Sequence, residues 1–200
     1  LKVVLVGNAN VGKTNLIQRY TTNTFSEAGK TTIGAEVTTK TIQTQAGDVQ
    51  FEIVDTAGQE VFRSLTASYY RYADAVLILF DITDRKSFED VPSWVNEAKT
   101  GSPANVEIIL VGNKTDQSEN CVVSQEEATR MANEHKMKYI EASGKLNTNI
   151  DHIFQTIMDE TLEKQIFLSR ETTSANRRAR AKKTSSQKLI QGLRSLAFRQ

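Results

Sequence analysis

A glycine-rich loop follows the first six residues of the chain. It matches the pattern G-x-x-x-x-G-K-[ST] and consists of Gly7, Asn8, Ala9, Asn10, Val11, Gly12, Lys13 and Thr14. The two glycines let the backbone bend so that its N–H groups can bind an anion, and a following helix adds the positive end of its dipole. Lys13 would reach the β- and γ-phosphates of a nucleotide, and the Thr14 hydroxyl would bind Mg²⁺. A glycine-rich turn without a ligand is the alternative, but a strand pattern before the loop and a helix pattern after it favour a phosphate site.

A second motif selects the base of the nucleotide. The phosphate loop alone is compatible with an ATPase, a nucleoside kinase or a GTPase. Asn113, Lys114 and Asp116 follow an apolar run at 106–111, and in open α/β sheets ligands bind at the carboxyl ends of the strands. The Asp116 carboxylate can accept hydrogen bonds from guanine N1–H and from the exocyclic amine, which adenine does not offer in that place. We therefore expect a guanine nucleotide, with a solvated polar loop as the alternative.

The remaining chemistry lies around the candidate strand at 49–54. Asp55 directly follows this strand and is placed to hold Mg²⁺. Gly58 can donate its backbone N–H to a γ-phosphate, and Gln59 is the candidate for orienting the attacking water. Thr32, in an upstream loop, offers a second hydroxyl. The predicted metal ligands are thus Thr14, Thr32 and Asp55.

The elements that must position these residues alternate between strand and helix patterns. Strands are predicted at 1–6, 36–45, 49–54, 75–80, 106–111 and 137–141, and helices at 11–20, 87–100, 124–135 and 148–165. Residues 46–48 are predicted to form a hairpin turn. The runs at 75–80 and 106–111 are almost continuously apolar, as is typical of parallel strands covered on both faces. This rhythm predicts a doubly wound α/β sheet, in which Pro92 would remove a hydrogen bond from the helix at 87–100.

Composition and charge divide the 200 residues into a body and a tail. Residues 1–169 carry 16 Lys and Arg against 23 Asp and Glu, a net charge of −7, whereas residues 170–200 carry 9 against 1, a net charge of +8. We expect one globular domain at 1–169 and a mostly disordered basic tail at 170–200. No apolar run approaches the ~20 residues that cross a bilayer. Cys121 is the single cysteine, so a cytosolic location is expected.

With these motifs in place, residues 1–168 resemble the Ras superfamily of small GTPases, and within it the Rab branch. The Rab-like segments are 33–36 (IGAE), 60–66 (EVFRSLT), 69–71 (YYR) and 80–83 (FDIT). The resemblance implies the P-loop NTPase three-layer fold, with a six-stranded, mostly parallel sheet flanked by about five helices. It also implies a GTP/GDP switch with Mg²⁺ that hydrolyses GTP slowly, because no arginine finger is evident within the chain.

The resemblance extends to further site residues and to partners. Phe25 would stack on the guanine edge, and Thr32 would close over Mg²⁺ and the γ-phosphate. Ser143, Gly144 and Lys145 resemble the family's Ser-Ala-Lys, whose backbone contacts the guanine oxygen. Exchange factors, GTPase-activating proteins and effectors would bind through segments near 25–37 and 55–72 of a monomer. Vesicle and membrane traffic is the implied process.

Three of the departures from the family pattern bear on function. Val54 replaces an aromatic residue, Val37 replaces a phenylalanine and Val61 replaces an arginine. We expect Val37 and Val54 to lie on the surface that meets effectors, so that a standard effector is not implied. These departures motivate an alternative in which the chain is a GTP-binding scaffold that does not cycle.

The tail lacks the C-terminal cysteines that take prenyl groups in Rab proteins, since no cysteine follows Cys121. Its apolar residues instead fall on one helical face, formed by Leu189, Ile190, Leu193, Leu196 and Ala197. A basic amphipathic helix near 188–199 would bind an anionic membrane on the cytosolic face of endomembranes. A disordered tail with a chance pattern and a helix docked on the chain's own body are the alternatives. Nucleic acid is not expected, because no aromatic residue interrupts the basic run at 177–183.

Overall fold

The computed structural model describes residues 1–27, 32, 34–45, 47–57 and 68–164. The chain divides into two compact units, Leu1–Thr161 and Leu162–Gln200. The whole sheet and all the described candidate site residues belong to the first unit. The expected tail helix and the residues Gly58, Gln59 and Val61 lie outside the described residues. Crossing a bilayer would take a longer and more apolar helix than any in the described part of the chain.

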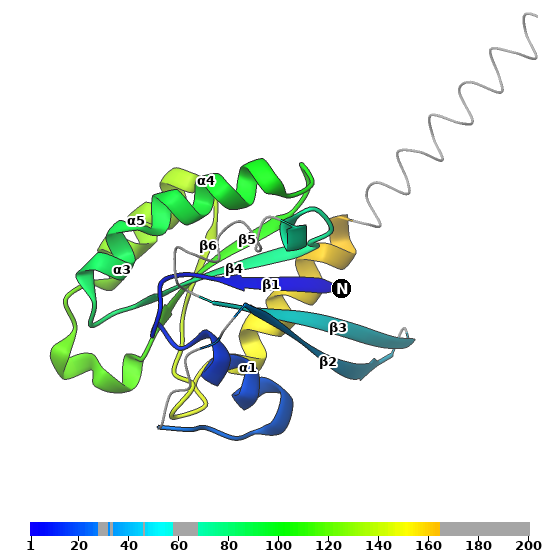
Figure 1. The fold of residues 1–200 in the computed structure, drawn as a ribbon, viewed down its shortest axis with the longest axis horizontal. Helices are drawn as coiled ribbons and strands as arrows, with labels where there is room; N and C mark the ends of the chain where they lie inside the picture. The colour runs from blue at the N-terminus through cyan, green and yellow to red at the C-terminus, as the bar shows by residue number, and fades with distance from the viewer. Residues whose placement is uncertain (28–31, 33, 46, 58–67, 165–200) are drawn as a thin grey trace, which may run out of the picture. The chain divides into compact units, whose positions relative to one another are not determined.

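A six-stranded sheet forms the centre of the first unit, with the strand order β2-β3-β1-β4-β5-β6 (Figure 1). Only the pair β2–β3 is antiparallel; all other neighbours are parallel. The predicted fold class is confirmed. The strands are β1 (Lys2–Val6), β2 (Ala35–Thr44), β3 (Gly47–Thr56), β4 (Ala75–Asp81), β5 (Glu107–Asn113) and β6 (Lys138–Glu141).

Helices cover both faces of the sheet and make the fold three-layered. They are α1 (Lys13–Thr22), α3 (Arg85–Glu89), α4 (Val91–Gly101), α5 (Gln125–His135) and a last helix whose described part is 150–164. Helices α3, α4 and α5 lie on one face, and α1 and the last helix lie on the other (Figure 1).

The two faces of the sheet carry different cores. On the α4 side, β4 residues such as Ile78 and Phe80 pack in one buried cluster with Trp94 of α4. On the α1 side, the rings of Tyr20 and Phe154 stack with centroids 3.6 Å apart. Burial on both faces is why β4 is apolar at nearly every position.

The helix predicted at 87–100 is in fact two helices, so that prediction is wrong. Asp84 caps α3 by accepting a hydrogen bond from the Lys86 amide, and the chain turns at Asp90 before α4 begins. Pro92 lies in the first turn of α4, where a backbone N–H has no intrahelical partner to lose. The expected loss of a helical hydrogen bond at Pro92 is therefore also wrong.

The β2–β3 hairpin turns earlier than predicted. Thr44 pairs with Gly47 and Gln43 pairs with Asp48, so Gly47 and Asp48 belong to β3 rather than to the turn. Gly47 has a φ of +123°, which a residue with a side chain rarely adopts. Glycine therefore serves here as the first residue of the strand.

The parallel strands deliver the candidate site residues to one edge of the sheet. The carboxyl end of β1 leads into the glycine-rich loop, and that of β3 carries Asp55. The ends of β4 and β5 carry Asp81 and Asn113, and Ser143 follows β6. Because these strands run in the same direction, five separate segments converge at the edge where ligands bind in such sheets.

Candidate nucleotide-binding site

Close contacts leave no room for a side chain at either motif glycine of the phosphate loop. A Cβ on Gly7 would lie 2.2 Å from the Leu79 carbonyl oxygen, and one on Gly12 would lie 2.4 Å from Asn113 Nδ2. Both residues also have positive φ angles, +137° and +96°. Gly12 precedes α1 and has no side chain to cap it, so the first amides of this helix are left to bind an anion.

Lys13 is held inside the loop. Its side-chain Nζ donates to the carbonyl oxygens of Gly7 and Asn8, each at 2.9 Å, and the residue is only 6% exposed. Burial lowers the pKa of Lys13 to about 8, although the charge of Asp55 acts in the opposite direction. A buried ammonium of this kind favours an anionic ligand, which would stabilise its charged form.

The three predicted metal ligands lie together. The Thr14 hydroxyl donates to Asp55 Oδ2 at 2.6 Å and lies 2.8 Å from the Thr32 hydroxyl, which lies 3.3 Å from the same carboxylate oxygen. Asp55 Oδ1 is buried and has no hydrogen-bond partner among the described residues. Burial also raises the pKa of Asp55, partly offset by Thr14, Lys13 and Thr32. An orphaned carboxylate oxygen beside two hydroxyls fits the all-oxygen ligand set of Mg²⁺.

The base-selecting motif is fixed by contacts to other segments. Asn113 is 3% exposed, and its Nδ2 donates to the carbonyl oxygen of Val11 at 2.8 Å, which ties β5 to the phosphate loop. Lys114 has a φ of +66° and pairs with Asp81 at 2.6 Å. Asp116 lies in a 3₁₀-helix, Thr115–Asn120, where its Oδ1 accepts from Ser143 Oγ at 2.5 Å.

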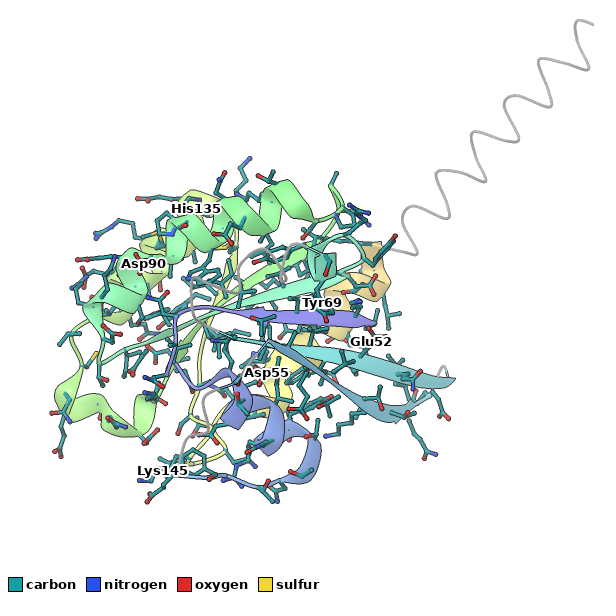
Figure 2. All side chains as sticks on the ribbon, viewed as in Figure 1. Glu52, Asp55, Tyr69, Asp90, His135 and Lys145 are labelled. Carbon is teal, nitrogen blue, oxygen red and sulfur yellow. The ribbon has the colours of Figure 1, made fainter. Side chains whose placement is uncertain are left out.

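The loop after β6 is held against α1. Ser143 is buried, and its Oγ also accepts from the Leu146 amide at 3.0 Å. Arg19 of α1 donates to the carbonyl oxygens of Gly144 at 2.8 Å and Lys145 at 3.2 Å. Figure 2 shows Lys145 in this loop and Asp55 at the end of β3. With both carbonyls engaged by Arg19, the loop's orientation relative to the phosphate site is fixed.

The remaining predicted residues differ in how far they are buried. Phe25 is half-buried, next to Ser26, whose backbone exchanges two hydrogen bonds with the Asn15 side chain of α1. Ala9 and Asn10 are exposed in the loop. Val54 is fully buried, so its expected place on an effector surface is wrong, whereas Val37 opposite it is 48% exposed. Paired residues of an antiparallel ladder point to the same face; Val54 lies there in the buried cluster that contains Trp94, whereas Val37 lies on the edge strand β2.

Sequence reasoning missed Asp81, Arg19 and the polar role of Trp94. Asp81 and Arg19 orient other site residues, and the signal for Asp81 was an acidic residue at the carboxyl end of a buried strand. Trp94 was expected only as helix core, yet its indole N–H donates to Asn8 Oδ1 at 2.8 Å. No local pattern could have indicated that contact.

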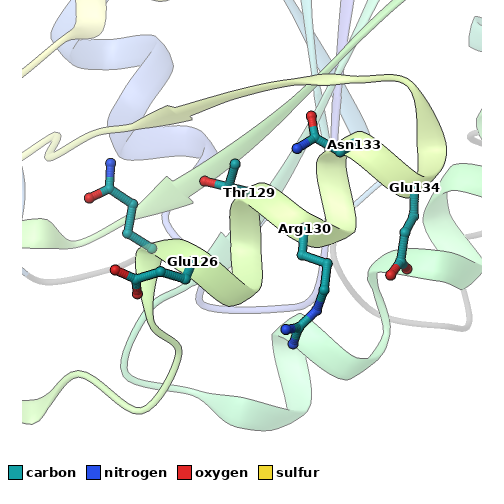
Figure 3. Close-up of a pocket in the computed structure, with 6 residues that line it drawn as sticks. Glu126, Thr129, Arg130, Asn133 and Glu134 are labelled. Atoms are coloured by element: carbon teal, nitrogen blue, oxygen red, sulfur yellow. The ribbon is translucent and has the colours of Figure 1, made fainter.

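A shallow depression on α5 is separate from this site (Figure 3). It is lined by six polar residues of that one helix: Gln125, Glu126, Thr129, Arg130, Asn133 and Glu134. None of the predicted nucleotide-site residues lines it. A surface formed by one helix offers no enclosure for a ligand.

Comparison with known proteins agrees with this geometry. The model of the Ras family matches residues 2–163. Ras-related protein Rab-11A of Dictyostelium discoideum is 40% identical over 159 residues, which cover 80% of this chain and 74% of that protein. GTP-binding protein ypt3 of Schizosaccharomyces pombe is 42% identical over 159 residues (80% and 74%), and Ras-related protein Rab-12 of Mus musculus is 38% identical over 165 residues (82% and 68%). The chain therefore belongs to the Ras family and is a Rab-like small GTPase, which binds guanine nucleotide.

Proposed function

We propose that the chain is a GTP/GDP switch in which Thr14, Thr32 and Asp55 hold Mg²⁺. The observation that carries the proposal is the contact of both hydroxyls with one Asp55 oxygen while the other oxygen stays buried without a partner among the described residues. When bound there, Mg²⁺ would neutralise charge on the β- and γ-phosphates. Thr32 lies upstream of β2, so its hydroxyl links an outlying segment to the phosphate site. Loss of the γ-phosphate would release that segment.

The remaining residues have distinct roles in this proposal. Lys13 places its ammonium on the β- and γ-phosphates, and the amides of the loop and of α1 surround them. Asp116, oriented by Ser143, accepts from the guanine edge, while Asn113 joins that segment to the phosphate loop. Phe25 stacks on the base. The backbone of Ser143, Gly144 and Lys145 faces the guanine oxygen.

Hydrolysis is assigned to Gln59, which orients the attacking water, with Gly58 donating its amide to the γ-phosphate. Both assignments rest on the motif after β3. Without an arginine finger of its own, the chain would turn over on the order of 10⁻⁴ s⁻¹, as Ras does unaided.

Regulators and effectors would bind a monomer through 25–37 and 55–72, where the exposed Val37 adds an apolar contact. The Rab names of the relatives support a role in membrane traffic, on the cytosolic face of endomembranes. The basic tail would bind that anionic surface, with attraction of ~1 kcal/mol for each Lys or Arg near it.

Single-turnover hydrolysis by the full chain tests the switch against the non-cycling scaffold. Phosphate release from bound GTP should follow one slow exponential, and Gln59→Ala should slow it at least about tenfold. Gln155→Ala, at an exposed position of the last helix, is the matched control and should not change the rate. Equal rates in the wild type and Gln59→Ala would favour the scaffold. Competition by GTP but not by ATP would exclude a kinase or an ATPase.

A further inference from the structure

The side chain of Asn8 joins the phosphate loop to α4. Its Oδ1 accepts from the indole N–H of Trp94 at 2.8 Å, and its Nδ2 donates to Asp90 Oδ2 at 2.8 Å. The amide is thus held at both ends by residues more than 80 positions away. Because its oxygen faces a donor and its nitrogen faces an acceptor, only one orientation of the amide satisfies both contacts.

The two partners of Asn8 are positioned independently of the loop. Trp94 is 2% exposed and packs in the core between α4 and the sheet. Asp90 lies where α3 ends and α4 begins, as Figure 2 shows, and its second oxygen accepts from Lys86 Nζ at 2.6 Å. The core therefore fixes the position of Trp94 and the helix junction fixes that of Asp90, and both hold the Asn8 side chain in place.

The backbone of Asn8 is part of the phosphate machinery. Its carbonyl oxygen accepts from Lys13 Nζ at 2.9 Å. Its neighbour Gly7 packs so closely on Leu79 of β4 that a Cβ would not fit. A shift of the Asn8 peptide would therefore move an oxygen that holds the Lys13 ammonium.

We infer that Trp94 and Asp90 are positioning residues for the phosphate loop and that they act through Asn8. Neither residue needs to touch the nucleotide. The inference deepens the proposed function and rests on it, because it assumes phosphates bound at Lys13. It also explains a chemical choice: a phenylalanine would fill the core beside α4, but only an indole also supplies the N–H that Asn8 accepts.

A second-site rescue separates this role from simple core packing. Asn8→Asp places a carboxylate against that of Asp90 and should speed GDP release at least about tenfold, since like charges in contact repel. Asp90→Asn alone should change release less, because an amide oxygen can still accept from Asn8. In the double variant the new amide donates to the new carboxylate, which still accepts from Trp94. Its release rate should return to within about threefold of wild type.

Trp94→Phe removes the indole N–H together with part of a buried ring, so its effect is read beside the rescue above, which leaves the core unchanged. It should speed GDP release about tenfold, the effect of one lost hydrogen bond with a partly buried acceptor left behind. Asn96→Ala, at an exposed position of α4, is the control and should leave release unchanged.

The chain has one tryptophan and five tyrosines, so emission excited at wavelengths that tyrosine does not absorb reports Trp94 alone. Emission should change when GDP is added to the nucleotide-free protein, and the change should be at least halved in Asn8→Ala at saturating GDP.

Absence of rescue in the double variant, unchanged release in Trp94→Phe, or an equal emission change in Asn8→Ala would each overturn the inference. If wild type failed to bind GDP, the proposed function would fall with it; tight wild-type binding with equal release in all variants would overturn the inference alone.

Discussion

Ser143 Oγ lies 2.5 Å from Asp116 Oδ1, so a buried hydroxyl after β6 orients the carboxylate that we propose selects the base. Asp116 follows β5 and Ser143 follows β6, the neighbouring strand. The Ser143 hydroxyl also accepts a hydrogen bond from the Leu146 amide. A serine can make both contacts because its hydroxyl donates one hydrogen bond, here to Asp116, and its oxygen accepts another, here from the Leu146 amide. In the proposed site, guanine recognition would therefore depend on the side chain of Ser143 as well as on its backbone.

Ser143→Ala should weaken guanine recognition. A hydrogen bond to a charged group contributes about 1.5 kcal/mol or more, so GDP release should accelerate roughly tenfold. Discrimination between GDP and IDP, which lacks the exocyclic amine, should narrow because the Asp116 carboxylate is no longer held in place. Dissociation constants for both nucleotides provide the measurement. Leu146→Ala, at a position 64% exposed, is the control, and an unchanged IDP-to-GDP ratio in Ser143→Ala would refute this role.

Asp81→Asn should loosen the same part of the site by a different route. Asp81 is 5% exposed, and its carboxylate pairs with Lys114 at 2.6 Å while accepting from the Thr83 amide and hydroxyl. The variant keeps an acceptor for Thr83 but removes the charge that holds Lys114. We expect about 1–2 kcal/mol lower stability, because the Lys114 side chain is partly exposed, and several-fold faster GDP release.

A double-mutant cycle with Lys114→Ala checks whether Asp81 acts through Lys114. If it does, the effect of Asp81→Asn on GDP release should largely disappear in the Lys114→Ala background. Additive effects of the two substitutions would show that Asp81 serves only to cap the turn at Thr83.

Much of the site could be predicted because its residues follow strands in short, ordered motifs. The parallel strands bring Lys13, Asp55 and Asp116 to one edge, and that convergence follows from strand direction alone. The contacts of Asn8 with Trp94 and of Arg19 with Gly144 join segments more than 80 residues apart, and no spacing rule encodes them.

Local errors in the prediction have local causes. The apolar spacing of 87–100 continues through Asp90, so periodicity alone gave one helix and hid the junction. Pro92 should have indicated a helix start, since proline is favoured in the first turn. Val54 and Val37 share one face of the sheet, but Val54 lies on the inner strand β3 and is buried, whereas Val37 lies on the edge strand β2 and is exposed.

Asp55→Asn should abolish the effect of Mg²⁺ on nucleotide release. In wild type, removing Mg²⁺ with EDTA should speed GDP release, because Thr14 and Asp55 would lose the ion that joins them to the phosphates. The variant should release GDP rapidly both with and without Mg²⁺. Release rates of a fluorescent GDP analogue in 5-fold steps of Mg²⁺ concentration would measure this. A variant that keeps the wild-type response to EDTA would place the metal on other residues.

The affinity for GDP should fall as the pH rises above about 8. Burial lowers the pKa of Lys13 from 10.5 to about 8, so above that pH the free protein increasingly holds a neutral amine. Bound phosphates favour the ammonium and raise this pKa, so binding takes up a proton and the dissociation constant should rise by up to about tenfold per pH unit.

The lowered pKa of Lys13 also makes the nucleotide-free protein more stable as the pH rises. The folded chain holds Lys13 less protonated than the unfolded chain does between pH 8 and 10.5, so the cost of burying its charge is full below pH 8 and is relieved as the pH rises through that window. Titration calorimetry at pH 7.0, 8.0 and 9.0 in buffers of different ionisation enthalpy would count the protons taken up with GDP. GMP, which lacks the β-phosphate, is the matched ligand and should take up fewer. Equal proton uptake for GDP and GMP at pH 9.0 would mean that Lys13 does not face the β-phosphate.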